Sequence, residues 1–231
     1  MARESGLRAA DDPVKTTKLI AGFSVAFLAA LSVQAQGTFQ NLNFEEANPV
    51  AAGNPYPAYD VTAASALPGW TVYYGTTQET VVAYNSFSTG APQVDLVNAA
   101  NGAIDGNYSV ILQGSLPGVS ISQTGLIPAG TQSLYFEAEP GLGSLDVLMG
   151  TQIVPIGAIG TGSNYTLYGA NISAWADDSE QITFAALGDS SEANNWNIDD
   201  ISFSDVPEPS TVALTAIGGL LFGARKWFAR R

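Results

Sequence analysis

The stretch LYFEA at Leu134–Ala138 has the apolar-rich, aromatic composition of a buried β-sandwich strand, and ITF at Ile182–Phe184 has the same character. Many similar short segments lie on either side, separated by turn-forming Pro-Gly pairs such as those at residues 68–69 and 117–118. No part of residues 36–206 has a long helical period or a fixed-length repeat. The sequence therefore predicts one all-β domain, a β-sandwich or jelly roll.

The expected strands are short and evenly spaced along this domain. They cover residues 70–74, 80–84, 93–97, 108–113, 119–124, 133–138, 144–148, 152–156, 165–168, 171–174, 181–186 and 195–204. Residues 45–66 are rich in Ala, Asn and Pro, so we expect them to form a long loop.

Charge is distributed unevenly along the chain. The 231 residues carry a formal net charge of −13, yet no Lys or Arg lies between Leu19 and Ala224, and the chain has neither Cys nor His. A middle region without cations cannot neutralise phosphates, which argues against nucleic-acid binding and phosphoryl transfer. The missing Cys and His exclude thiol nucleophiles, His-based triads and zinc sites that use these ligands.

The N-terminus has the pattern of a secretory signal. Lys15 and Lys18 precede the uncharged apolar residues 19–33. Small residues at −3 and −1 predict cleavage between Ala35 and Gln36, and the Sec machinery would then export the protein. The alternative is an uncleaved N-terminal anchor.

The C-terminus combines three features in a fixed order. A turn motif is followed by an apolar helix from Thr211 to Ala224, and the chain ends in a basic cluster. The motif is Val206, Pro207, Glu208 and Pro209, and the cluster contains Arg225, Lys226, Arg230 and Arg231. Such a helix with a basic end predicts a transmembrane segment whose tail stays in the cytoplasm. The expected organisation is a signal peptide with a polar N-terminal extension (1–35), a β-sandwich domain (36–205) and a sorting signal (206–231).

This tail resembles the PEP-CTERM sorting signal of Gram-negative bacteria, and the resemblance covers residues 206–231. It implies processing near the motif by an exosortase, transient membrane anchoring, and delivery to the cell surface or the extracellular matrix. The same tail is also catalogued as an ice-binding protein C-terminal domain, a label that concerns the tail and not ice binding. A plain tail anchor is the alternative.

The middle region resembles galactose-binding-like jelly rolls, including many carbohydrate-binding modules. The resemblance rests on five segments in order, at Phe39–Glu45, Leu67–Trp70, Gly106–Val110, Ile121–Thr124 and Trp196–Ile201. It implies that the first and last strands pair or lie adjacent.

By the same resemblance, a structural calcium would tie Glu45 to Asp199, with Asp200 and Glu46 as alternative ligands. Calcium takes six to eight oxygen ligands, which carboxylates and carbonyls supply. The alternative is that these acids are solvated or hydrogen-bonded at strand ends.

Sugar binding is the function that we expect for the domain, with extracellular polysaccharide as ligand. Candidate contacts are Trp70, Tyr73, Tyr74, Tyr84, Trp175, Asn85 and Asn98. Among the tryptophans, Trp70 and Trp196 are expected in the core and Trp175 at the surface. A glycosidase would need an organised carboxylate pair. Only the chance spacing of Glu137 and Glu139 suggests one, so we expect no catalysis, with a carbohydrate-active enzyme and a calcium-dependent adhesion module as alternatives.

Overall fold

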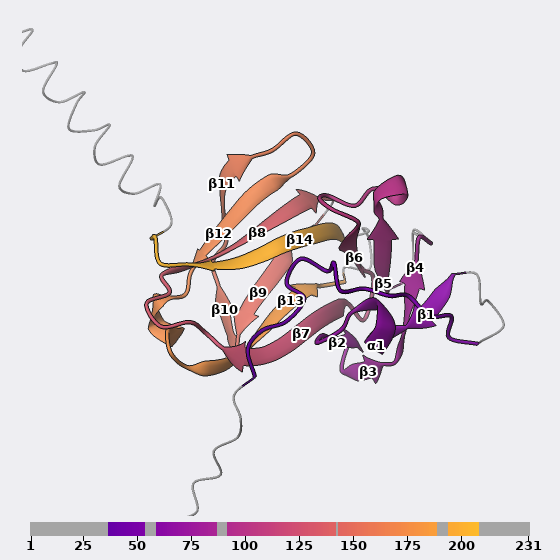
Figure 1. Ribbon diagram of the computed structural model, residues 1–231, viewed down its shortest axis with the longest axis horizontal. Coiled ribbons are helices and arrows are strands. Elements are labelled where there is room, and N and C mark those ends of the chain that lie inside the picture. The colour runs from indigo at the N-terminus through magenta and orange to yellow at the C-terminus, as the bar shows by residue number, and fades with distance from the viewer. Residues whose placement is uncertain (1–36, 54–58, 87–91, 142, 189–193, 208–231) are drawn as a thin grey trace, which may run out of the picture. The chain divides into compact units, whose positions relative to one another are not determined.

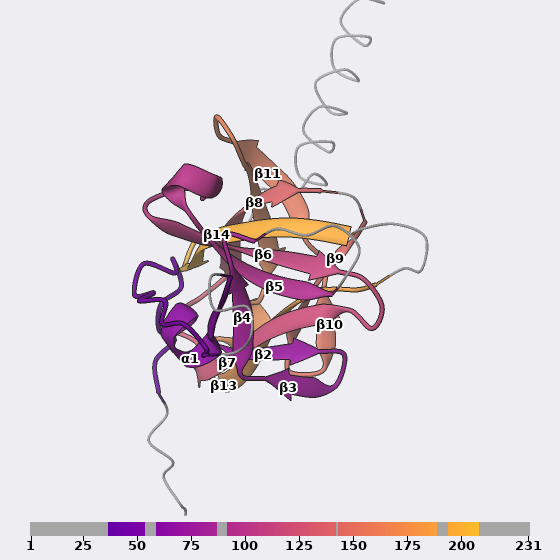
Figure 2. The same ribbon diagram turned by 90° about the vertical axis from the view of Figure 1, so that its right-hand side faces the viewer.

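Two β-sheets pack face to face in the computed structural model of the protein (Figures 1 and 2). The structure describes residues 37–53, 59–86, 92–141, 143–188 and 194–207. Within them the regular secondary structure is almost entirely strand, as the alternation and turn signals predict, and the all-β sandwich is confirmed.

The larger sheet has eight strands. Their order is β1 (Asp60–Thr62), β4 (Val81–Tyr84), β5 (Gln93–Asn98), β6 (Tyr108–Gly114), β14 (Asn194–Ser204), β8 (Ser133–Pro140), β12 (Thr166–Asn171) and β11 (Gly157–Thr161). All neighbours are antiparallel except β4 and β5. The last strand, β14, therefore lies at the centre of the sheet, between β6 and β8.

The smaller sheet has six strands. Their order is β10 (Gln152–Val154), β9 (Leu145–Met149), β13 (Ser179–Ala186), β7 (Val119–Leu126), β2 (Thr71–Tyr74) and β3 (Thr77–Glu79). Three single-turn helices connect strands in the described part of the chain: α1 (Ala63–Ala66), η1 (Ala99–Asn101) and η2 (Ser173–Trp175).

Aromatic side chains from both sheets meet in the core. Phe136 of β8 and Phe184 of β13 are fully buried, with ring centroids 5.2 Å apart and an edge-to-face arrangement. Trp70 lies 6.3 Å from Phe184 and 5.8 Å from Phe44. Edge-to-face pairs add to the free energy of burial because ring edges and faces carry opposite partial charge. These contacts connect the N-terminal segment and both sheets.

The tryptophans behave largely as predicted. Trp70 and Trp196 are each 6% exposed and belong to the core. The indole N–H of Trp70 donates to the carbonyl of Asn41 at 3.0 Å. Trp175 is half-buried and packs against the core edge, so the prediction of a surface tryptophan is only partly correct.

The N-terminal segment lies beside the last strand, although it forms turns and not a strand. The amide of Ile201 donates to the carbonyl of Leu42 at 3.0 Å. The rings of Phe39 and Phe203 are 5.1 Å apart. The two ends of the domain are therefore adjacent.

The prediction of a strand at 171–174 is wrong. Asn171 ends β12, and its side-chain oxygen accepts the amide of Ser173 at 3.1 Å, which starts η2. Asn favours such turns because its side chain can replace a strand hydrogen bond. Residues 45–66, expected to be a loop, contain β1 and α1.

Two further strands were not predicted because their sequences are poor strand formers. β3 is a three-residue segment, Thr-Gln-Glu, and β11 contains two glycines. Both are edge strands of their sheets, where one side of the backbone is unpaired and the demands on sequence are lower.

Several sequence expectations concern residues outside the described ranges. The signal segment with its cleavage site at Ala35 and Gln36, and the tail from Glu208 onward, lie there. The described chain ends just after Val206, which is 59% exposed and whose carbonyl accepts the hydroxyl of Tyr135 at 3.2 Å. Within the described residues, no helix has both the length and the apolar character needed to cross a bilayer.

Replacing Phe184 with Ala should lower the free energy of unfolding by about 3–5 kcal/mol, because it leaves a cavity where three aromatic rings meet. Chemical denaturation measures the change. Leu187→Ala, at a side chain that is 51% exposed, is the control and should change stability by less than about 0.5 kcal/mol. Similar losses for the two variants would contradict the position of the core.

Candidate functional site

Polar side chains line the outer face of the eight-stranded sheet. Leu112, Trp196 and Ile198 point into the core, so the residues that alternate with them point outward. One outward row crosses four strands, because Asp95 is opposite Ile111, Ile111 opposite Asn197, and Asn197 opposite Glu139.

A second row lies beside the first. Gln93 of β5 is opposite Gln113 of β6, and Gln113 is opposite Asn195 of β14. Three amide side chains from neighbouring strands therefore follow one another across the sheet, within contact distance of the next. The outer face at the centre of the sheet thus consists mainly of amides and carboxylates.

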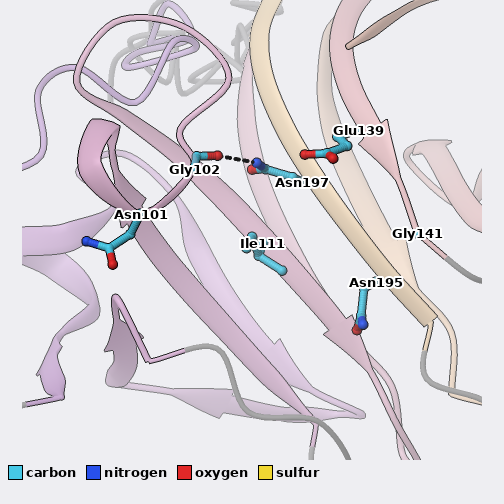
Figure 3. Close-up of a pocket in the computed structure, with 7 residues that line it drawn as sticks. All are labelled: Asn101, Gly102, Ile111, Glu139, Gly141, Asn195 and Asn197. Carbon is cyan, nitrogen blue, oxygen red and sulfur yellow. Dashed lines mark hydrogen bonds between the residues drawn. The ribbon is translucent and has the colours of Figure 1, made fainter. Parts of the chain in front are cut away.

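A groove of about 310 Å³ lies on this face (Figure 3). Its lining residues are Asn101, Gly102, Ile111, Glu139, Gly141, Asn195 and Asn197. Strands β6 and β14 supply Ile111, Asn195 and Asn197, while the η1 loop and the end of β8 supply the others. Figure 3 shows the carboxylate of Glu139 directed toward Asn197.

Asn197 connects the groove floor to the η1 loop. Its amide nitrogen donates to the carbonyl of Gly102 at 2.9 Å, and its side-chain oxygen accepts the hydroxyl of Ser109 at 2.7 Å. Asn101 donates to the side-chain oxygen of Asn98 at 2.7 Å. The nitrogen and the oxygen of the Asn197 side chain thus both have partners within the protein, so this residue holds the groove wall in place.

The remainder of this loop is held by Asp199 and Glu45. The amide of Asp105 donates to Asp199 Oδ2 at 3.2 Å. Glu45 Oε1 accepts the amides of Asn107 at 2.6 Å and Tyr108 at 2.9 Å, and its Oε2 accepts the Asn107 side chain at 2.7 Å. Glu45 and Asp199, the predicted calcium ligands, therefore both contact the segment 105–108.

As arranged, these two carboxylates are hydrogen-bond acceptors. Each oxygen named above already accepts an N–H donor. The described ranges contain no group of three or more acidic, His or Cys side chains that could hold a metal ion. Asp200 and Glu46, the alternative ligands, are exposed. Calcium at this pair stays a prediction.

Burial changes the pKa values of the carboxyl groups on this face. It raises the pKa of Asp199 to about 8, against the opposing effect of hydrogen bonds from Asp200 and Asp105. Burial also raises the pKa of Asp95 to about 6, and raises that of Glu137. Burial also tends to raise the pKa of Glu45. The hydrogen bonds from Asn107 and Tyr108 outweigh this effect, so the pKa of Glu45 is lowered.

The aromatic residues named as sugar contacts do not line the groove. The hydroxyl of Tyr74 accepts the amide of Val94 at 3.2 Å, and that of Tyr84 accepts the side chain of Asn98 at 3.3 Å. Asn85 accepts the amide of Asn98 at 2.9 Å. Tyr84, Asn85 and Asn98 thus form a cluster at the start of η1 and support its position.

Sequence reasoning missed the groove residues Asn101, Asn195 and Asn197 as binding candidates. The alternation Asn-Trp-Asn-Ile-Asp from Asn195 to Asp199 was the available signal, because it places two amides and a carboxylate on one face of a strand. The contribution of Asn101 and Glu139 depends on which strands are neighbours, and no local pattern reveals that.

Comparison with known proteins gives a remote structural likeness only. No protein-family model and no curated protein matches the chain. The carbohydrate-binding module TmCBM61, solved in complex with β-1,4-galactotriose, is 18% identical with a TM-score of 0.35, and the match covers 73% of this chain and 98% of that one.

A second similar structure is a family 11 carbohydrate-binding module from Clostridium thermocellum, solved with a β-1,3-1,4-mixed-linked tetrasaccharide. It is 10% identical with a TM-score of 0.34, and the match covers 65% of this chain and 96% of that module. At this level of similarity, neither structure indicates which residues of this chain bind a ligand.

Stability should fall as the pH rises from about 5 to 8. Unfolded Asp ionises near pH 3.9, whereas folded Asp199 holds its proton up to about pH 8 and Asp95 up to about pH 6. The folded state therefore binds more protons in this window, and the free energy of unfolding decreases with pH. Chemical denaturation at several pH values measures the slope.

Asp199→Asn should flatten this slope between about pH 6 and 8, because Asn cannot titrate. Asp178→Asn, at an exposed position, is the control and should keep the wild-type slope. An unchanged slope in the Asp199 variant would contradict the burial of that carboxyl.

Proposed function

We propose that the protein is an exported, non-catalytic protein of the cell surface or extracellular matrix, and that its β-sandwich binds extracellular polysaccharide in the groove on the eight-stranded sheet. One observation carries the binding proposal. Three Asn side chains and one Glu, on three segments distant in sequence, line a single groove on a rigid sheet.

The chemistry of these side chains suits a sugar. An amide offers two donors and an acceptor, and a carboxylate offers acceptors, which together match the hydroxyl groups of a pyranose. The groove volume of about 310 Å³ is at the lower end of ordinary small-ligand sites. The lining contains no aromatic side chain, so binding would depend on hydrogen bonds more than on ring stacking.

The side-chain oxygen of Asn195 is covered and has no hydrogen-bond donor among the residues that the structure describes. An unpaired buried acceptor destabilises a fold, so such groups normally find a donor in water or a ligand. A hydroxyl in the groove, met by a small rotation of this amide, would supply that donor.

The export part of the proposal rests on the two chain ends. The signal segment and the PEP-CTERM-like motif, Val206 to Pro209, agree on one topology with the domain outside the inner membrane. Val206 is exposed, which suits access by a processing enzyme such as an exosortase. A galactose-binding-like jelly roll is the finer fold assignment that fits this proposal.

Replacing Asn195 with Ala should lower the affinity for a bound oligosaccharide by about tenfold, roughly the effect of one lost hydrogen bond. A glycan array identifies the ligand, and titration calorimetry measures the affinity. Stability should stay the same or rise, because the substitution removes an unpaired acceptor. Gln152→Ala, exposed on the other sheet, is the matched control. Equal affinities of the two variants, or no glycan bound at all, would reject the proposed site.

A further inference from the structure

We propose that the groove selects a cationic amino sugar, a polysaccharide with free protonated amines, and that Glu139 is the residue that recognises the amine. This inference rests on the proposed function and names its ligand class. It follows from the difference between Glu139 and the other carboxylates on the same sheet face.

The other carboxylates of this face already have partners. Asp199 accepts the amides of Asp105 and Asp200, and Asp95 accepts the amide of Ser86 at 3.0 Å. Glu137 shares a hydrogen bond with the side chain of Tyr165. Asp95 and Glu137 each keep one oxygen without a partner, but both oxygens are buried and cannot meet a ligand without a rearrangement.

Glu139 differs from these carboxylates in its exposure and in its lack of a partner. Its side chain is exposed, and within the described part of the chain it has neither a hydrogen-bond donor nor an ion-pair partner. It lines the groove, where its carboxylate is directed toward Asn197 (Figure 3). A carboxylate in a polar groove is a ready acceptor for an ammonium group, which carries three donors and a positive charge.

The charge of the whole domain also favours a cationic ligand. Residues 36–206 contain 17 Asp and Glu and no Lys or Arg, so no cation of the domain can bind an acidic sugar. A uronic-acid or sulfated polysaccharide would meet only like charge and desolvation cost at Glu139. A polycationic chain would instead be attracted over the whole surface and oriented by the one free carboxylate in the groove.

The amides of the groove favour a sugar over a basic peptide. Asn101 and Asn195 line the same groove as Glu139, from the η1 loop and from β14. In an amino sugar the amine has hydroxyl groups on the neighbouring ring carbons, and these could bond to the amides while the amine meets the carboxylate. A lysine side chain has an ammonium group at the end of an apolar stem and offers nothing to the amides.

The test compares four defined probes by titration calorimetry with the exported protein, at a pH below the pKa of the sugar amine. The probes are β-1,4-linked glucosamine tetrasaccharide, its fully N-acetylated form, cellotetraose and a tetralysine peptide. We expect the glucosamine tetrasaccharide to bind at least about fivefold more tightly than its acetylated form, the effect of one exposed ion pair. High salt should remove this difference.

Glu139→Gln should abolish the preference for the free-amine tetrasaccharide over its N-acetylated form. Because the side chain is exposed, the variant should melt at the wild-type temperature. Glu180→Gln, at a Glu of the six-stranded sheet, is the matched control and should keep the full preference.

The outcomes separate the two proposals. Equal binding of the acetylated and free-amine probes would overturn the amino-sugar inference and leave saccharide binding in place. Tetralysine binding as tightly as the glucosamine probe, with the same dependence on Glu139, would overturn the ligand class. Absence of binding by every saccharide on the array and in solution would reject the proposed function itself.

Discussion

The fold has to bury acidic side chains without a single cation in the domain to pair with them. Asp199 is 1% exposed, and no Lys or Arg lies between residues 19 and 224. Backbone N–H groups take the place of cations, because Asp199 and Glu45 accept them from the segment 105–108. These bonds join the N-terminal segment, the central strand β14 and the η1 loop. The wall of the groove depends on this network, and Asn197 extends it to Gly102.

Local sequence patterns predicted most of the strands, because period-two alternation and Pro-Gly turns are local signals. They did not predict β3 or β11, whose residues favour strand only when a neighbour pairs with them. The groove could not be predicted from local patterns. It depends on β14 lying between β6 and β8, a non-local arrangement that places Glu139 opposite Asn197. Two of the aromatic residues predicted as sugar contacts have structural roles, because the hydroxyl of Tyr74 accepts the backbone amide of Val94 and that of Tyr84 accepts the side chain of Asn98.

The polar residues around the groove have two different roles. Asp199, Glu45 and Asn197 are satisfied within the protein and fix the shape of the groove. Asn195 and Glu139 line the groove and retain unused hydrogen-bonding capacity, although the unpaired oxygen of Asn195 is covered. Preorganised supports with a few free polar groups are typical of sites that bind hydroxylated ligands, because little side-chain freedom is lost on binding.

Binding of a saccharide in this groove can be tested by titrating an isotopically labelled sample with an oligosaccharide and recording the side-chain amide resonances by NMR. We expect the resonances of Asn101 and Asn195 to shift in a saturable way, while those of Gln152 and Gln181 on the other sheet do not. Shifts confined to the six-stranded sheet, with the groove amides unchanged, would contradict binding in this groove.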